Sequence, residues 1–135
     1  GQSHMALSVK LERELAEIED SEERQEFLQD LGLTQSALDR IITKTTALLG
    51  LITFLTAGEK EVRAWKVTQG ATAPEAAGVI HSDLQKGFIR AEVLSWEDFC
   101  AVKNFKEAKD KGLLRLEGKD YIVQDGDIIT FRFNV

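Results

Sequence analysis

The stretch from Gly70 to Val93, GATAPEAAGVIHSDLQKGFIRAEV, constrains the fold more than any other part of the chain. Thr72 and Glu75 have the spacing of a capping box, in which each residue satisfies a free N–H group at the start of a helix. Pro74 falls in the first helical turn, where its missing N–H costs no hydrogen bond. A helix is therefore predicted to begin directly after Thr72 and to end near His81.

The residues that follow this helix alternate in polarity. Ile89, Ala91 and Val93 are apolar, whereas Arg90 and Glu92 between them are charged. A period of two is typical of a strand with one buried face. The three apolar side chains are thus predicted to face the core, and the whole stretch predicts a turn, a helix and a strand.

Amphipathic helices are predicted between residues 6 and 50. The first has an apolar stripe at spacings of three and four residues, made by Leu7, Leu11, Leu15 and Ile18. Asp20 with Glu23 caps a second helix, which stops at Gly32, and Gly50 ends a third. Three helices in about 45 residues form too thin a layer to bury their apolar faces without a partner surface. Self-association through the first helix is therefore one of the outcomes that the sequence leaves open.

The period changes at Leu51 from that of helices to that of strands. A β-hairpin is predicted first, and the helix and strand of the Gly70–Val93 stretch follow it. The remaining predicted elements are short helices at 96–102 and 105–111, short strands at 114–117 and 121–123, and a last strand with Ile129, Phe131 and Phe133 on one face. This order predicts an α+β fold of the β-grasp, or ubiquitin-like, kind, preceded by a short all-α segment.

Composition bounds the class of protein. The 135 residues are 43% hydrophobic, which suffices for one modest core. No run approaches the roughly 18 uninterrupted apolar residues of a membrane span, and no signal peptide is evident, so a soluble cytoplasmic protein without membrane contact is expected. Cys100 has no second cysteine to pair with, which agrees with a reducing compartment. Beside Phe99, it is predicted to lie in the core.

The net charge of −6 is unevenly distributed. Residues 6–50 contain 5 basic and 10 acidic side chains, whereas the remainder is nearly neutral. Contact with RNA would therefore need a local cationic patch on the remainder. The candidate residues are Arg63, Lys66, Lys86 and Arg90. The alternative is an ordinary solvated sheet face, on which Glu61 and Glu92 are interleaved with these cations.

His81 and Asp83 have two interpretations. An imidazole beside a carboxylate is a common acid–base device. The alternative is structural, with His81 closing the helix end by hydrogen bonding. A metal site needs three or four ligands, which two residues do not supply. We therefore assign Thr72, Glu75, His81 and Asp83 to a structural motif and predict no catalytic or metal-binding residue in this chain.

Several runs resemble known sequences. The Gly70–Val93 stretch resembles the signature of the TGS domain, a β-grasp module. FLTAGEKEVRAW (54–65), KGFIRAEV (86–93) and EGKDYIVQDGDIITFRFNV (117–135) resemble the carboxyl end of YchF-type Obg-like ATPases. EFLQDLGL (26–33) and ALLGL (47–51) are similar to the segment that joins the nucleotide-binding domain of that family to its TGS domain.

This resemblance implies a domain organisation and a parent activity. Residues 1–5, GQSHM, are typical of an expression-tag remnant. The resemblance implies a helical connector from the nucleotide-binding domain at 6–50 and a TGS domain at 51–135. The parent is expected to hydrolyse ATP or GTP with magnesium and to associate with ribosomes. The present sequence has no G-x-x-x-x-G-K-[ST] run, whose backbone and lysine hold nucleotide phosphates. We therefore expect no bound nucleotide and no ATP hydrolysis by this chain alone.

Two functions follow from the sequence. The first is a non-catalytic regulatory and docking module for the ribosome or RNA, which also contacts the parent's nucleotide-binding domain. The second is a ubiquitin-like adaptor for protein–protein interaction that has no nucleic-acid role. An enzyme that uses His81, Asp83 or Cys100 is the least favoured class.

Overall fold

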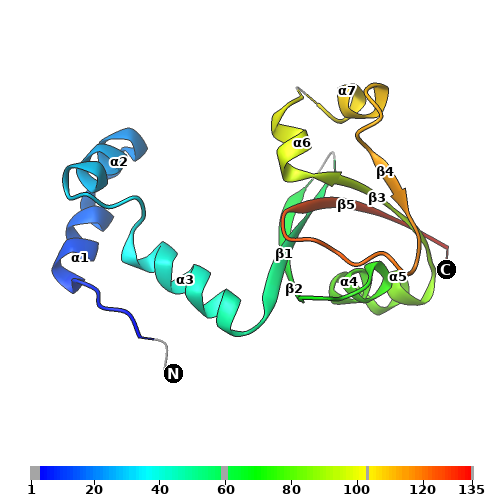
Figure 1. Ribbon diagram of the computed structural model, residues 1–135, viewed down its shortest axis with the longest axis horizontal. Helices are drawn as coiled ribbons and strands as arrows, with labels where there is room; N and C mark the ends of the chain where they lie inside the picture. The colour runs from blue at the N-terminus through cyan, green and yellow to red at the C-terminus, as the bar shows by residue number, and fades with distance from the viewer. Residues whose placement is uncertain (1–3, 59–60, 103, 135) are drawn as a thin grey trace. The chain divides into compact units, whose positions relative to one another are not determined.

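The computed structural model describes residues 4–58, 61–102 and 104–134. The chain consists of two compact units, with the division between Leu48 and Leu49. The amino-terminal unit contains helices and the carboxyl-terminal unit contains a sheet with further helices (Figure 1). In the part of the chain that the structure describes, no helix has the length and apolarity that crossing a membrane requires.

The amino-terminal unit consists of α1 (Val9–Glu17), α2 (Ser21–Asp30) and α3 (Ala37–Leu48). Asp20 caps α2, because its carboxylate accepts hydrogen bonds from the backbone N–H groups of Glu22 and Glu23 at 2.8 and 2.9 Å. The Glu12 carboxylate accepts from the Ala37 N–H at 2.8 Å and so joins α1 to the start of α3.

The predicted apolar stripe of the first helix is only partly buried. Leu15 is 3% exposed, whereas Leu7 precedes α1 and is 45% exposed. Further along the unit, Leu38, Ile42 and Leu48 of α3 are also exposed. Self-association through the first helix stays a prediction.

The carboxyl-terminal unit is built on a five-stranded sheet with the order β2-β1-β5-β3-β4. Its strands are β1 (Leu51–Ala57), β2 (Val62–Thr68), β3 (Phe88–Ser95), β4 (Arg115–Glu117) and β5 (Asp127–Phe133). β1 and β5 are parallel, and the other neighbours are antiparallel. The predicted hairpin is confirmed by the pairing of β1 with β2. The tip of the turn predicted at 57–60 lies outside the described residues at positions 59 and 60.

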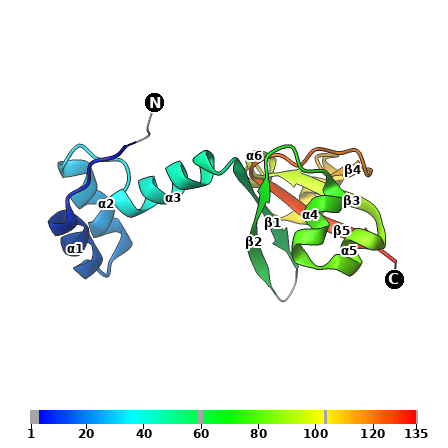
Figure 2. The ribbon, with the colours of Figure 1, turned by 90° about the horizontal axis from the view of Figure 1, so that it is seen from below.

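Helices lie on both faces of the sheet. α4 (Ala73–Ile80) and α5 (Ser82–Lys86) cover one face, called the inner face here (Figures 1 and 2). α6 (Trp96–Cys100) and α7 (Phe105–Asp110) follow β3 and lie toward the opposite, outer face (Figure 1). The helix predicted after Thr72 is confirmed as α4, and the helix predicted after Ser95 is confirmed as α6.

The core lies between α4 and the inner face. Alanines on α4 allow the helix to approach the sheet closely, and they are fully buried. Larger side chains from the strands fill the space beneath the helix. The main cluster includes Phe54, Val67, Ala73, Ala76, Ala77, Phe88, Ala91, Val93, Val123 and Ile129.

One prediction for β3 is wrong. Ile89 was expected to be buried, but it is 55% exposed, whereas Phe88 is 5% exposed. The cause is an irregularity in the pairing of β3 with β5 between Phe88 and Arg90, which shifts the alternation. Beside it, a Cβ at Gly87 would collide with the carbonyl oxygen of Asn134, so the two backbone segments can approach this closely only because residue 87 is a glycine.

The strand predicted at 121–123 is also wrong. Only an isolated bridge joins Ile122 to Thr72. The Ala73 N–H donates to the Tyr121 carbonyl oxygen at 2.8 Å, and the Val123 N–H donates to the carbonyl oxygen of the loop residue at position 71 at 3.0 Å. The segment therefore pairs with the loop that leads into α4 and not with another strand.

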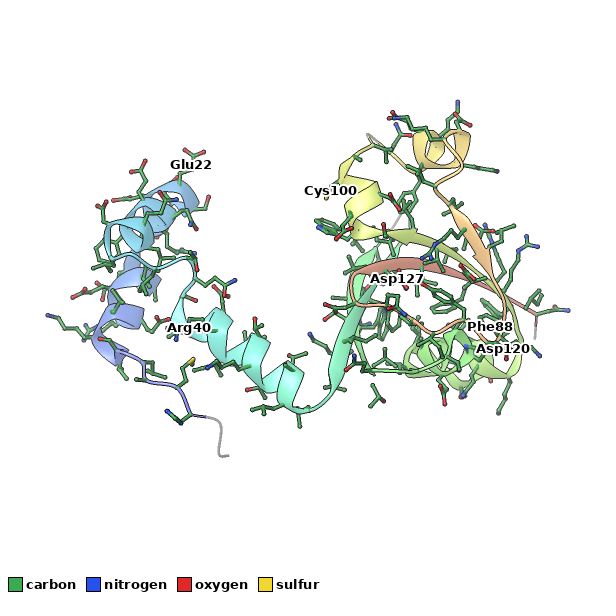
Figure 3. The ribbon with its side chains drawn as sticks, in the orientation of Figure 1. Glu22, Arg40, Phe88, Cys100, Asp120 and Asp127 are labelled. Carbon is green, nitrogen blue, oxygen red and sulfur yellow. The ribbon has the colours of Figure 1, made fainter. Side chains whose placement is uncertain are left out.

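Cys100 is exposed, which corrects its predicted place in the core. It is the last residue of α6, a helix of five residues. The aromatic contacts of this helix are made by Trp96 and Phe99, whose ring centroids are 6.1 Å apart, and by Phe99 with Phe105 at 5.2 Å. These contacts leave Cys100 at the surface (Figure 3).

The packing of Phe54 gives a test of this core. Its side chain is 0% exposed and its ring meets Phe131 edge to face at a centroid distance of 6.0 Å. We expect Phe54→Ala to lower the free energy of unfolding by about 3–5 kcal/mol, because transfer and cavity terms add. Denaturant unfolding followed by tryptophan fluorescence measures this change, since Trp65 and Trp96 both belong to the same unit.

Val62→Ala is the matched control on the neighbouring strand. Val62 is 71% exposed. Its truncation removes little buried surface, so a loss below about 1 kcal/mol is expected. Equal losses in the two variants would contradict the assigned core.

Candidate functional site

The two candidate cations on β2 lie on opposite faces of the sheet. Arg63 shares the inner face with Trp65 because side chains alternate along a strand, and its guanidinium carbon lies 4.1 Å from the centroid of the Trp65 ring. Lys66 lies on the outer face, where its Nζ donates to the Thr53 hydroxyl oxygen at 2.6 Å.

Lys86 and Arg90 lie away from both of these residues. Lys86 is the last residue of α5, and Arg90 is on the outer face of β3. Leu55 of β1 lies opposite Ile128 of β5. Lys66 pairs with Thr53, two residues before Leu55, and Arg90 pairs with Arg132, four residues after Ile128. At about 3.3 Å per residue, Lys66 and Arg90 are roughly 20 Å apart along the strands.

The four candidate cations are therefore not one continuous strip. The structure places one on the inner face, two at opposite ends of the outer face and one at the end of a helix. Their contact with RNA stays a prediction, in which RNA would be contacted at separate positions and not along one strip.

A different set of charges meets around Glu92 on the outer face. Arg132 of β5 donates to the two carboxylate oxygens of Glu92, from Nε at 2.9 Å and from Nη2 at 3.1 Å. The Nη2 atom of Arg90 is 4.0 Å from the same carboxylate. These residues, together with Lys109 of α7, line a cavity of about 290 Å³.

The charges of this cluster alter the titration of its members. The hydrogen bonds from Arg132 lower the pKa of Glu92, and the positive charges of Arg132, Arg90 and Lys109 act in the same direction, against the effect of burial. The Glu92 carboxylate in turn raises the pKa of Arg132. Sequence reasoning did not select Arg132 or Lys109, because only the pairing of β3 with β5 and the position of α7 bring them to Arg90.

The residues assigned to a structural motif all act at helix ends. The Thr72 N–H and hydroxyl donate to the Glu75 Oε2 atom at 2.7 and 2.9 Å, at the start of α4. The His81 N–H donates to the carbonyl oxygen of Ala77 at 3.1 Å, and its Nδ1 accepts from the Asp83 N–H at 3.2 Å. His81 thus ends α4 and begins α5.

The geometry of His81 and Asp83 does not favour a catalytic or metal site. The His81 side chain is 65% exposed, and its Nδ1 is 3.4 Å from the Asp83 carboxylate. Among residues 4–58, 61–102 and 104–134, no group of three or more His, Cys, Asp or Glu side chains is arranged to hold a metal ion.

A buried polar network at the start of β5 was not anticipated from the sequence. Asp127 is 2% exposed, and its Oδ2 accepts from the Tyr121 hydroxyl at 2.7 Å and from the Gln124 N–H at 2.9 Å (Figure 3). Burial, followed by the hydrogen bond to Asp127, raises the pKa of Tyr121 to about 12. The Arg115 Nη2 atom lies 3.6 Å from Asp127, so the network joins β4 to β5.

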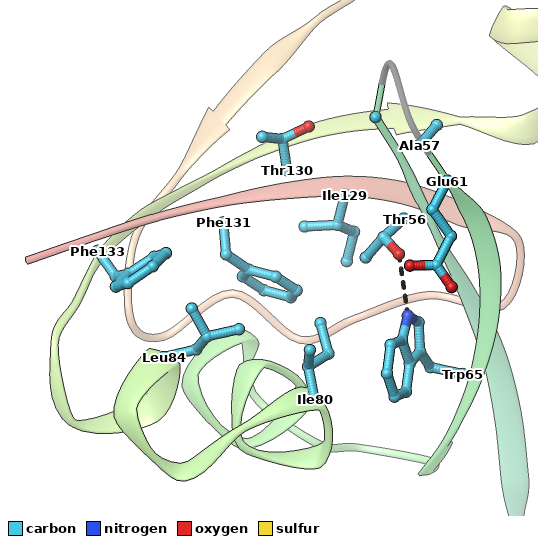
Figure 4. A pocket seen from close by; sticks show the side chains of 11 residues that line it. Thr56, Ala57, Glu61, Trp65, Ile80, Leu84, Ile129, Thr130, Phe131 and Phe133 are labelled. Carbon is cyan, nitrogen blue, oxygen red and sulfur yellow. Dashed lines mark hydrogen bonds between the residues drawn. The ribbon is translucent and has the colours of Figure 1, made fainter.

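An apolar cavity of about 580 Å³ opens on the inner face (Figure 4). Ile80 and Leu84 border it from the helices, and Phe131 borders it from β5. The Trp65 Nε1–H donates to the Thr56 hydroxyl oxygen at 2.9 Å, which fixes the indole at its rim (Figure 4). Such a lining accommodates apolar groups and offers few polar groups for chemistry.

The comparisons with known proteins identify the family. Residues 51–134 match the family model YchF-GTPase_C, which is described as a protein of unknown function (DUF933). The chain therefore belongs to the YchF-GTPase_C family.

Curated relatives and a solved structure agree with this family. The chain is 60% identical over 93% of its length to "Ribosome-binding ATPase YchF" of Haemophilus influenzae, and 53% identical over 97% to the protein of that name from Bacillus subtilis. It spans 34% and 36% of those relatives, so it corresponds to about a third of their length. The Schizosaccharomyces pombe YchF GTPase structure matches 93% of this chain with a TM-score of 0.80 and 35% identity, over 33% of that chain.

A more distant structure supports the fold only. A GTP-binding protein from Pyrococcus horikoshii matches 82% of this chain with a TM-score of 0.51 and 22% identity, and the match covers 28% of that chain.

The capping carboxylate of α4 gives a pH-dependent prediction. The hydrogen bonds from the Thr72 backbone and then from its hydroxyl lower the pKa of Glu75 below 4.5. A lowered folded-state pKa contributes stability above the unfolded pKa, and this contribution is lost as the pH falls through the folded value. The deficit of Glu75→Gln in free energy of unfolding should therefore be full at neutral pH and should shrink as the pH falls below 4.5.

Denaturant titrations across this acid range measure the deficit. Glu61→Gln is the control, because Glu61 is exposed and precedes β2, and its free energy of unfolding should stay within about 0.5 kcal/mol of the parent chain. A Glu75→Gln deficit that does not change with pH would argue against the charged cap.

Proposed function

We propose that this chain is the regulatory and docking module of a YchF-type ATP- or GTP-hydrolysing protein, and that its partner is the ribosome or another RNA-containing particle. The printed name of the relatives, "Ribosome-binding ATPase YchF", supports this proposal at identities of 53% and 60%. In it, a nucleotide-binding domain elsewhere in the parent holds ATP or GTP with magnesium, and the cytoplasm is the site of action.

The proposal includes a division of the chain. Residues 6–50 are the helical connector from the nucleotide-binding domain, and residues 51–135 are a TGS domain with the β-grasp fold. Three observations support this division: the family match begins at residue 51, the strand order is β2-β1-β5-β3-β4, and β1 is parallel to β5 with α4 against the sheet. Residues 1–5 are taken as the remnant of an expression tag.

The observation that carries the docking role is the exposed positive charge on the sheet unit. Arg90 and Arg132 have 53% and 55% of their side-chain surfaces exposed, on the same outer face. Exposed cations release counterions from a phosphate backbone on binding, so they attract RNA even where the chain as a whole is acidic. The net charge of −6 arises largely in the amino-terminal helices, away in sequence from these arginines.

The adaptor role for protein partners has one observation in its favour. The apolar cavity on the inner face borders β2, which is an edge strand of the sheet. Apolar docking there would persist at high salt, whereas RNA contact weakens steeply with salt. Salt dependence therefore distinguishes the two functions.

Charge reversal tests the docking role directly. Lys86→Glu combined with Arg90→Glu should weaken co-sedimentation of the chain with ribosomes by about tenfold, because two phosphate contacts are lost and two repulsions are gained. A ribosome pelleting assay at several salt concentrations measures the change.

Lys44→Glu is the control, since Lys44 is exposed on α3 and carries the same charge. Unchanged pelleting of the double variant would remove Lys86 and Arg90 from the interface. Pelleting of the parent chain that does not weaken with salt would favour the protein adaptor.

A further inference from the structure

We propose that Arg90, Lys109 and Arg132 form a phosphate-binding site, called the outer-face cation site here, which takes a phosphodiester group of RNA. This inference rests on the docking function proposed above and makes it specific. Its three cations come from β3, α7 and β5, which are separate in sequence and meet around one cavity.

The strand register explains why this place needs an anion. Arg90 and Arg132 are directly opposite each other on neighbouring strands. Like charges in this arrangement are destabilising unless an anion lies between them. Glu92 supplies a single carboxylate, and Arg90, Lys109 and Arg132 carry three positive charges, so the groups that line the cavity have a net charge of +2.

The contacts of Glu92 leave capacity for a second anion. Arg132 binds both carboxylate oxygens in a forked arrangement, which is the strong geometry for a guanidinium. The 4.0 Å between Arg90 and Glu92 is too long for a hydrogen bond. The N–H groups of Arg90 are therefore not hydrogen-bonded to Glu92 and can donate to phosphate oxygens.

The cavity also has room and an apolar border. Its volume is about 290 Å³, and Leu114 and Leu116 complete its lining. Because a single water needs only about 10–15 Å³, a group of several atoms fits.

The exposure of the arginines favours a polymeric phosphate over a free one. With more than half of their side-chain surfaces in solvent, each contact is weakened by screening. A nucleic-acid strand adds further contacts along its backbone, whereas a free phosphate has only the contacts within the site. Glu92 competes with the phosphate for the Arg132 guanidinium.

Salt-dependent binding of RNA tests the site. Fluorescence anisotropy of a labelled single-stranded oligoribonucleotide is measured with the 135-residue chain over a series of salt concentrations. Arg90→Gln, Lys109→Gln and Arg132→Gln should each weaken binding several-fold, and the three combined should reduce the slope of log K against log salt by about 0.7, which corresponds to one phosphate on a single strand. Lys44→Gln is the control, because Lys44 is exposed on α3 and is not one of the candidate RNA contacts, so its affinity and slope should equal those of the parent chain.

Glu92→Gln separates phosphate binding from a purely structural role. Removal of the competing carboxylate should tighten RNA binding, whereas a structural ion pair predicts weaker binding or none. The thermal midpoint of each variant is measured by circular dichroism as a check on folding. The change in RNA affinity of Glu92→Gln is the result whose sign differs between the phosphate site and the structural ion pair.

The outcomes distinguish this site from the function on which it rests. If the parent chain binds RNA and ribosomes but the three glutamine variants keep the parent affinity, the outer-face cation site is wrong and the docking role survives. If the parent chain binds neither, both are wrong. Binding of pyrophosphate at this site without binding of RNA would overturn the RNA assignment in favour of a free phosphate.

Discussion

The pairing of β5 between β1 and β3 is the constraint on which the sheet unit depends. β5 is parallel to β1 and antiparallel to β3, so residues from three distant parts of the sequence are held in one register. On the inner face this register packs Ile129 and Phe131 against Phe54 and α4. On the outer face the same register sets Arg132 opposite Arg90. The core and the proposed phosphate site are therefore two consequences of one strand pairing.

Much of the fold could be predicted because its signals are local. The capping pair Thr72 and Glu75, with Pro74 in the first turn, locates α4 to the residue. The errors arose where a contact from elsewhere in the chain overrides the local pattern. The irregular pairing near Phe88 turns Ile89 to the surface, and the loop before α4 takes the hydrogen bonds of the segment predicted as a strand at 121–123.

The candidate site was less predictable than the fold. Arg90 was selected from its strand pattern, but its partners Lys109 and Arg132 lie 19 and 42 positions further along the chain. Conversely, Arg63 and Lys66 are close in sequence yet lie on opposite faces, because their odd spacing on a strand alternates them. Charge that is scattered in sequence becomes a site only through cross-strand register, which a single sequence does not specify.

The central claim is that RNA is contacted through the outer face near Arg90 and Arg132. Amide chemical-shift mapping by NMR during titration with an oligoribonucleotide tests it most directly. We expect the largest changes at residues 90–92 and 130–132 and in α7, with little change in α4 or β2. Changes centred on α4, β2 and the apolar cavity beside Trp65 would contradict the account.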